Sequence, residues 1–197
     1  MPGEMFDIRA HDTVPAAPGD LELVQRFLNL HEHLPDREEP VPASRELIEA
    51  FLKERALLAR AEAFTEEDRG AALSLRGALH AKVRANLGGR PSERDISTID
   101  DAARRAGLRP RFTRDGPALE PSEPGVDGAL GHIVSIAFLA DLDGSWEHLK
   151  ECVGLDCDSV FYDRSKNHSA RWCSMSACGN RAKVRAWRER RRADADA

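Results

Sequence analysis

The stretch that decides the fold of one end of this chain reads CVGLDC at residues 152–157 and CSMSACGNR at residues 173–181. These two C-x4-C pairs contain all four cysteines of the 197-residue chain. Four thiolates can close a tetrahedral site around one Zn²⁺ and leave no open position for a substrate. The pattern therefore predicts one structural zinc per chain, bound by Cys152, Cys157, Cys173 and Cys178.

Other interpretations of the cysteines remain open from the sequence. The gap of four residues within each pair is wider than the commoner gap of two, so spacing alone does not identify the metal. The thiols could instead form a redox pair or be inert core groups. His168 lies between the two pairs and could replace one sulfur as a ligand.

The local sequence predicts how the module is built. Gly154 allows a tight turn inside the first pair. Residues 159–163 alternate and contain aromatics, which favours a short strand, and residues 164–168 form a polar turn. A second strand is expected at 171–172, and a helix begins near Cys178. This arrangement is typical of a zinc ribbon or treble clef, and the metal would supply about 10–16 kcal/mol of folding energy.

Charge is distributed unevenly along the chain. Its formal net charge is −5, but residues 159–192 hold ten basic and two acidic residues. The remaining 19 basic and 32 acidic residues make the rest of the chain strongly acidic. An acidic body with a basic end suggests a polyanionic partner for that end, although a solvated tail would have the same composition.

A basic helix is expected over residues 182–192, which contain no Gly or Pro. Val184 and Trp187 are expected to pack on the zinc module. Asn180 could contact nucleic acid, cap the helix or support a zinc-bound sulfur. Arginines at helical spacing share one face, where guanidinium groups can bind phosphate or guanine. The residues expected to bind nucleic acid are Arg171, Asn180, Arg181, Lys183, Arg185, Arg188 and Arg192.

Upstream of the module, helical periodicity dominates. We expect helices over 20–32, 44–57, after Thr65, from Ser92 to Gly107, and over 125–142, with a hairpin at 108–122. The expected inward side chains include Leu57, Ile96, Ile99, Ala103, Phe138 and Leu142. The fold class is therefore α+β: a mainly helical N-terminal domain with a small β-hairpin, followed by the four-cysteine module and its basic helix.

This organisation predicts three segments: a helix-rich domain over 1–143, the zinc module over 144–192, and a disordered tail over 193–197. Residues 1–10 lack the apolar core of a signal peptide. The longest nearly apolar run, 133–140, is too short to cross a bilayer. We therefore expect a cytoplasmic protein without a membrane partner, in which clustered cysteines bind metal rather than form disulfides.

The sequence WCSMSACGNRAK at 172–183, preceded by VFYDRSK at 160–166, resembles the CGNR zinc-finger family. The family takes its name from the run found here at 178–181. LVQRFLN at 23–29 and LRGAL at 75–79 resemble helices of the ABATE domain that precedes this finger, with Leu30 where the family usually has Thr. The resemblance implies a bacterial, stress-induced transcription regulator that binds zinc through the four matching cysteines and binds DNA.

Polar residues also occur on the apolar helices of the N-terminal region. Asn29, His31, Arg76 and His80 could line a pocket for a small-molecule effector, or they could be satisfied groups of the core or its rim. The chain contains no nucleotide-binding glycine loop, HExxH or GxSxG motif, so an enzyme is not expected.

Taken together, these features predict a zinc-dependent DNA-binding transcription regulator. Its N-terminal domain would sense a signal or form a homodimer. Two alternatives remain at this level. The chain could be an RNA- or ribosome-associated zinc protein, because arginine-rich helices also bind RNA. It could also be an adaptor whose basic tail binds an acidic protein surface.

Overall fold

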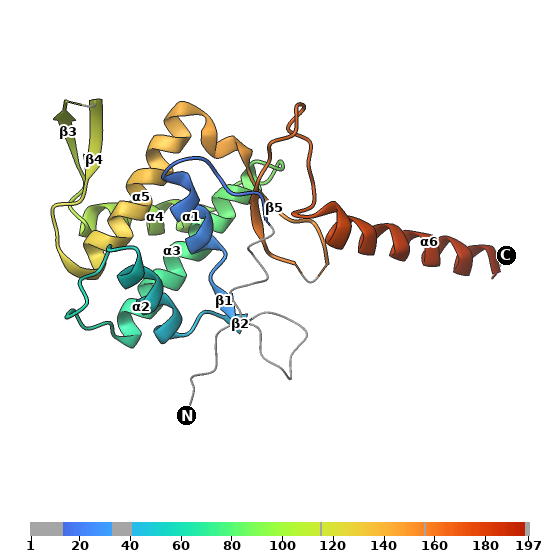
Figure 1. The fold of residues 1–197 in the computed structure, drawn as a ribbon, viewed down its shortest axis with the longest axis horizontal. Helices are drawn as coiled ribbons and strands as arrows, with labels where there is room; N and C mark the ends of the chain where they lie inside the picture. Colours follow the sequence, from blue (N-terminus) through green and yellow to red (C-terminus); the bar gives the residue numbers. More distant parts are fainter. Residues whose placement is uncertain (1–13, 33–40, 115, 156, 196–197) are drawn as a thin grey trace.

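The computed structural model describes residues 14–32, 41–114, 116–155 and 157–195. A helical body carries a short hairpin at one end and a long C-terminal helix that projects from the other (Figure 1). In chain order the elements are α1 (Leu21–Leu28), β1 (His31–Glu32), β2 (Val41–Pro42), α2 (Arg45–Glu54), α3 (Glu66–Ala85), α4 (Glu93–Arg105), β3 (Arg109–Thr113), β4 (Gly116–Glu120), α5 (Gly125–Asp143), the 3₁₀ turn η2 (Ser145–His148), β5 (Leu149–Glu151), β6 (Val160–Tyr162), the π-helical turn η3 (Met175–Gly179) and α6 (Asn180–Ala195). The predicted α+β class is confirmed.

Hydroxyl side chains begin three of the body helices, as predicted. The side chain of Ser44 accepts a hydrogen bond from the backbone of α2. Thr65 and Asp68 form a reciprocal capping box at α3, and Ser92 and Asp95 form another at α4. Each cap satisfies backbone N–H groups that the first helical turn leaves without partners, which stabilises a helix by about 1 kcal/mol.

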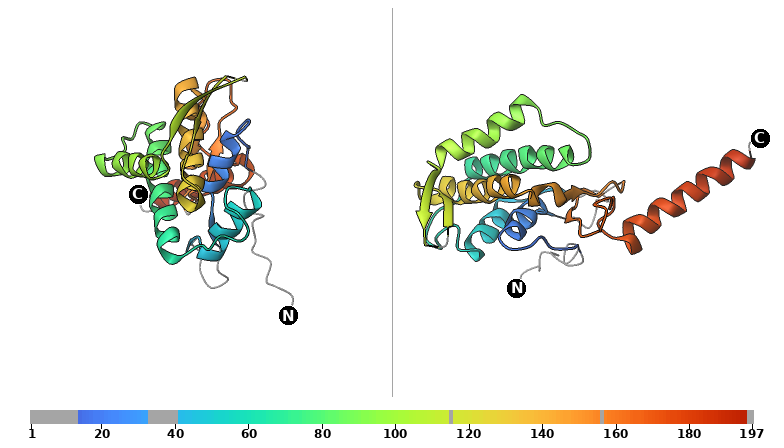
Figure 2. Two further views of the ribbon diagram at one scale, coloured as in Figure 1. Left: turned by 90° about the vertical axis from the view of Figure 1, so that its left-hand side faces the viewer. Right: turned by 90° about the horizontal axis from the view of Figure 1, so that it is seen from above.

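Helix α5 lies at the centre of the body, packed against α1, α3 and α4 (Figure 2). With 19 residues and a mean hydropathy of 1.4, α5 is long and apolar enough to span a membrane. However, 56% of its most apolar stretch is buried inside the protein. Ile133, Leu130 and Ala137 belong to the core cluster that also includes residues of α1, α2 and α3. The apolar run predicted at 125–142 is thus the core helix.

Helices α4 and α5 approach each other closely at Gly131. A Cβ placed on Gly131 would lie 2.1 Å from the Cβ of Ala106. Ala106 is fully buried just after the end of α4, and Gly107 follows in the left-handed region with φ of 58°. The positive φ explains why the predicted stop of α4 is a glycine.

The hairpin β3–β4 is antiparallel, with Arg109 opposite Glu120 and Thr113 opposite Gly116. This confirms the hairpin predicted from the Asp-Gly turn, although Asp115 itself lies outside the described residues. The hairpin contacts α5 through β4 and leaves Phe112 94% exposed.

Two helices end earlier than predicted. Helix α1 stops at Leu28 rather than near Glu32. The side chain of Asn29 forms a hydrogen bond with the backbone of the distant residue Val160, and the chain then enters β1. Helix α2 stops at Glu54, so Leu57 lies beyond it and packs on the core from a turn.

Some expected inward side chains are exposed. Ile96 of α4 is largely exposed, and Ala102 is the buried residue of that helix. Phe138 and Leu142 of α5 are also exposed, because only one side of its last turns faces α1 and the core. Ile99 and Ala103 do pack against the core, as predicted.

The zinc module begins inside the same core. Trp146 of η2, Leu149 of β5 and Val160 of β6 are buried in the cluster formed by the body helices. At the other end of the module, α6 continues through residue 195, past the predicted start of a disordered tail at 193; residues 196–197 lie outside the described part. Ala193 is a strong helix former, which explains the extension.

Replacing Gly131 with Ala should destabilise the protein by about 1–3 kcal/mol, because the new methyl group would overlap Ala106. The matched control is Gly77→Ala in α3, where nothing lies within 4 Å of the added Cβ. The control should stabilise the protein by about 0.5–1 kcal/mol through helix propensity. Urea denaturation of both variants measures the difference, and equal effects would contradict the close packing of α4 and α5.

Candidate metal centre and basic helix

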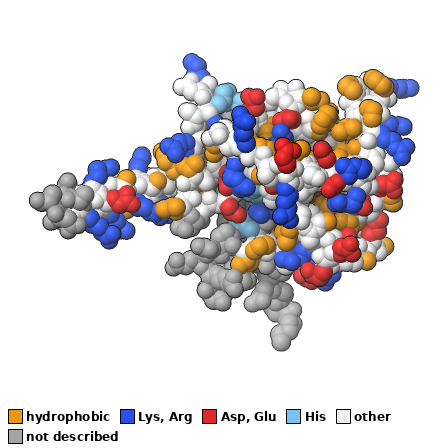
Figure 3. Space-filling view, turned by 180° about the vertical axis from the view of Figure 1, so that it is seen from behind, with side chains coloured by type: hydrophobic (Ala, Val, Ile, Leu, Met, Phe, Trp, Pro, Cys, Tyr) orange, Lys and Arg blue, Asp and Glu red, His pale blue; other side chains and the backbone are white. Residues whose placement is uncertain are grey.

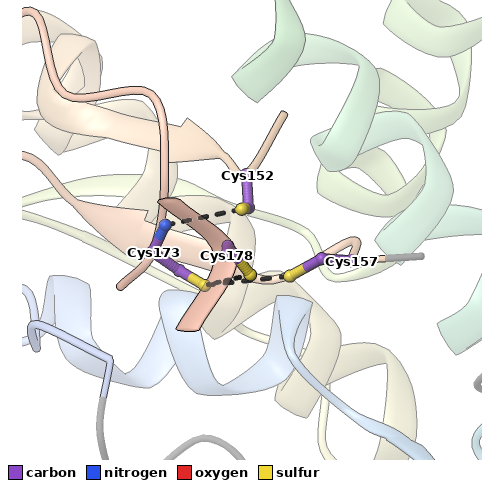
Figure 4. Close-up of side chains that lie close together, drawn as sticks. All are labelled: Cys152, Cys157, Cys173 and Cys178. Atoms are coloured by element: carbon purple, nitrogen blue, oxygen red, sulfur yellow. Dashed lines mark hydrogen bonds between the residues drawn. The ribbon is translucent and has the colours of Figure 1, made fainter. Parts of the chain in front are cut away.

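The four cysteines converge from two segments, residues 152–157 after β5 and residues 173–178 before α6, as Figure 4 shows. Their Sγ atoms all lie within 4.8 Å of one another. The Sγ atom of Cys173 is 3.7 Å from that of Cys157 and 3.7 Å from that of Cys178. Zn–S bonds of about 2.3 Å in a tetrahedron place the sulfurs about 3.8 Å apart. The spacing therefore fits one tetrahedral zinc.

Polar groups surround the sulfurs. The backbone N–H groups of Gly154 and Cys173 point to Cys152 Sγ, each at 3.4 Å. The hydroxyl of Ser159 lies 3.4 Å from Cys157 Sγ, and Arg181 Nη2 donates to Cys178 Sγ at 3.1 Å. Such groups stabilise the negative charge that thiolates retain on a metal and hold the ligands in place.

Crowding changes the acidity of these thiols. The pKa of Cys157 is lowered because its sulfur accepts hydrogen bonds from Cys152 and then Cys173. The pKa of Cys152 is raised to about 11 by its hydrogen bond to Cys157, and the pKa of Cys173 is raised by its bonds to both. Because a thiol loses its proton when it binds a metal, zinc binding at this cluster would release protons.

The strand pairing of the module differs from the prediction in one respect. Strand β6 forms as expected, but it pairs with β5, whose residues precede Cys152, through Leu149 opposite Tyr162. The segment at Arg171–Trp172 forms no strand, although Arg171 accepts a backbone hydrogen bond from Val153 at 3.0 Å. β6 pairs instead with β5, whose Leu149 is anchored in the core of the body, so the expected strand at 171–172 does not form.

A buried ion pair fixes the polar turn that leads to the second cysteine pair. Lys150 Nζ lies 3.0 Å from Asp163 Oδ2, and both side chains are almost fully buried. Asp163 also accepts from the N–H groups of Ser165 and Ala170, each at 2.9 Å. Burial raises the pKa of Asp163, but the hydrogen bonds from Ser165, Lys150 and Ala170 outweigh it and keep the pKa low. Lys150 donates to the carbonyl of His168 as well.

Polar side chains of α1 bind the backbone of β6. Asn29 Nδ2 donates to the carbonyl of Val160 at 2.8 Å, and Val160 N–H donates to Asn29 Oδ1 at 2.7 Å. Gln25 Nε2 donates to the same carbonyl at 3.1 Å. These bonds take the place of a neighbouring strand and join the helical body to the zinc module.

A second set of contacts joins α3 to the residues beside the cysteines. His80 bridges the Leu28 carbonyl and Glu151 Oε2, each at 2.9 Å. Both partners are acceptors, so both contacts are hydrogen bonds only when the ring carries two protons. Arg76 donates to the same Leu28 carbonyl at 2.8 Å and lies 3.6 Å from Asp158.

These contacts change the interpretation of the predicted pocket residues. Asn29, Arg76 and His80 direct polar atoms at the module, and His31 Nδ1 lies 3.7 Å from Asp158. They therefore connect two parts of the chain, and a ligand role for them stays a prediction. Glu151 and Asp158 were not singled out from the sequence, although each is the immediate neighbour of a cysteine, Cys152 and Cys157.

Helix α6 leaves the module with most of its surface exposed, and Figure 3 shows basic side chains along it. The predicted packing of Val184 and Trp187 on the module is wrong: they are 46% and 51% exposed. The helix is straight and projects away, so it turns these residues to solvent (Figure 1). A hollow of about 220 Å³ separates the opposite side of α6 from residues 153–155.

The residues predicted to bind nucleic acid fall into two groups. Arg181, Lys183, Arg185, Arg188 and Arg192 are exposed along α6. The other two lie at its base. Asn180 is exposed and donates to the Ser176 carbonyl at 3.1 Å, and the side chain that caps the preceding turn is Ser174. Arg171 is exposed with its guanidinium over the ring of Trp172.

Two protein-family models match the chain, one over the helical body and one over the C-terminal module. Residues 21–142 match the family model ABATE, described as "Putative stress-induced transcription regulator". Residues 148–191 match the CGNR zinc finger. No curated protein matches the chain. The C-terminal module is therefore a zinc finger with a site for one structural zinc, and the first match spans more than half of the chain.

Replacing Cys173 with Ser should release zinc and unfold the finger, because three thiolates leave the tetrahedral site open and the finger depends on the metal for stability. Metal analysis of reduced protein should fall from one zinc per chain to a small fraction. His168→Asn is the matched control, since the His168 ring only packs against His148 at a tilt and the residue adopts a left-handed conformation that Asn tolerates. Zinc loss in the control together with retention in Cys173→Ser would contradict the four-sulfur site.

Replacing Asn29 with Ala should destabilise the protein by about 2 kcal/mol or more, because the N–H of Val160 loses its buried partner. Exposed Asn167→Ala is the matched control and should change stability by less than about 0.5 kcal/mol. Urea denaturation followed by circular dichroism gives both values. An unchanged midpoint for Asn29→Ala would show that the contact with β6 contributes nothing to folding.

Proposed function

Because the chain belongs to the ABATE family, described as "Putative stress-induced transcription regulator", we propose that it is a zinc-dependent regulator that binds DNA through its finger and basic helix. The body would sense a signal or form a homodimer. In this proposal the protein works in the cytoplasm, responds to stress and has no catalytic role. The family description supports regulation, and the DNA-binding step is the part that experiment has to test.

The observation that carries the proposal is the exposure of α6. Between residues 180 and 192 the sequence has seven basic residues and one acid, and every one of these charged side chains is exposed. The helix extends away from the acidic body rather than lying on it (Figures 1 and 2). A free cationic helix attracts a polyanion and can displace the counterions of nucleic acid.

Zinc has a structural role in this proposal. The four cysteines would hold the ion and so join residues 152–157 to residues 173–178. Because Cys178 lies in the turn that leads into α6, the metal would fix where the helix begins and how it leaves the finger. Arg181 neutralises part of the thiolate charge, which its raised pKa reflects through the hydrogen bond to Cys178.

The contacts between body and finger support a role for the body in regulation. Asn29 binds the backbone of Val160 in the finger. His80 contacts Glu151, the residue before Cys152, and Arg76 lies near Asp158, the residue after Cys157. A signal that moves α1 or α3 would therefore move the base of the finger as well.

Binding to labelled duplex DNA should fall steeply with salt. With about four phosphate contacts, log K should fall with log salt at a slope near −3.6. When Arg185, Arg188 and Arg192 are all replaced by Ala, the slope should become less steep by about 2.7, because three phosphate contacts are lost. This variant keeps the hydrogen bond from Arg181 to Cys178 Sγ, so its zinc content should not change. Fluorescence anisotropy across a salt series measures both slopes.

The matched control replaces three exposed arginines of the body, Arg60, Arg94 and Arg104, with Ala. It removes the same charge and should leave the slope unchanged. Equal losses in both variants would mean that net charge, not α6, controls binding. Stronger binding to duplex RNA would favour an RNA-associated protein, and no binding to either at low salt would overturn the proposal in favour of an adaptor.

A further inference from the structure

We propose that α6 lies in the major groove of duplex DNA with a narrow stripe of Asn180, Val184, Trp187 and Arg191 facing the base edges. The inference rests on the proposed function and specifies how the helix reads its target. It assigns the choice of sequence to the stripe and most of the affinity to the basic residues on its two sides.

The stripe follows from helix geometry. At about 100° per residue, positions 180, 184, 187 and 191 fall within about 60° of one another. Val184 and Trp187 are 46% and 51% exposed. The guanidinium of Arg191 lies 5.0 Å from the centre of the Trp187 ring, which holds the indole along the helix rather than against the finger. The result is an apolar ridge with one amide at its base and one cation near its tip.

Basic side chains flank the stripe on both sides. Arg188 borders the stripe on one side, with Arg181, Arg192 and Arg185 progressively further round the helix, and Lys183 and Arg190 lie on the other side. The back of the helix is different. Ala182, Ala186 and Glu189 border the hollow opposite residues 153–155, together with Arg181 and Arg185 at its edge, and Glu189 is the only acid between positions 180 and 192. The surface turned away from the finger is therefore apolar in the middle and cationic at both margins.

The major groove of B-DNA complements this pattern. It is wide enough for an α-helix and carries a phosphate strand along each side. Its floor offers thymine methyl groups for apolar contact and adenine edges for Asn180. The cations beside the stripe would then meet the two phosphate strands at once.

Other occupants fit less well. A second copy packed through the same stripe would bring arginines against arginines, and like charges facing each other are unfavourable. A membrane-surface helix needs a broader apolar face than Val184 and Trp187 provide. The major groove of duplex RNA is too narrow and deep for side chains to read. The charge pattern thus favours duplex DNA.

The experiment selects binding sequences from a random duplex library with the zinc-loaded full chain. It then compares dissociation constants for the selected and a scrambled duplex across a salt series. Trp187→Ala should reduce the ratio of the dissociation constants for scrambled and selected duplex about tenfold, because a base contact is lost. It should leave the slope of log K against log salt unchanged. Arg188→Ala should weaken binding to both duplexes equally and reduce the steepness of the salt dependence by about 0.9.

Controls separate this inference from the proposed function. Ala186→Ser changes the back of the helix and should alter neither the ratio nor the slope. Circular dichroism and zinc content check that each variant is folded. If the wild-type chain binds no duplex DNA, the proposed function fails and the inference fails with it. If it binds but selects no sequence, or Trp187→Ala leaves the ratio intact, the inference alone is overturned. Dimers that Trp187→Ala dissociates would also overturn it, because the stripe would then join two copies.

Discussion

The convergence of four sulfurs on one small volume is the constraint on which this end of the molecule depends. Two loops that are distant in the sequence must bring Cys152, Cys157, Cys173 and Cys178 within 4.8 Å of one another. Four thiolates this close repel one another unless a cation lies between them, so the geometry favours a bound metal. The position of α6 follows from it, because that helix starts two residues after the last sulfur.

The body supports this constraint through buried polar contacts rather than through a large apolar interface alone. Asn29 satisfies both backbone groups of Val160, and His80 joins the end of α1 to the acid before Cys152. Such groups are costly to bury without partners, so they specify one relative placement of body and finger. A module of this size has little core of its own, and Trp146 and Leu149 obtain theirs from the body.

The local signals of the sequence were sufficient for much of the fold. Hydroxyl caps at Ser44, Thr65 and Ser92 marked helix starts correctly because a cap depends only on the next three residues. Helix ends were less predictable: α1 stops where Asn29 finds a partner 131 residues away. The same limit explains Trp187, whose exposure depends on the direction in which α6 leaves the finger.

The sequence by itself predicted a four-cysteine metal site, the order of the helices and the cationic character of the last helix, since each rests on residue type and short-range spacing. Only the tertiary structure decided that β5 pairs with β6, that Asn29, Arg76 and His80 bind the finger, and that α6 extends freely. The reason is physical. These features arise from contacts between segments distant in the chain, and packing of the whole core selects among many partners that local patterns allow equally.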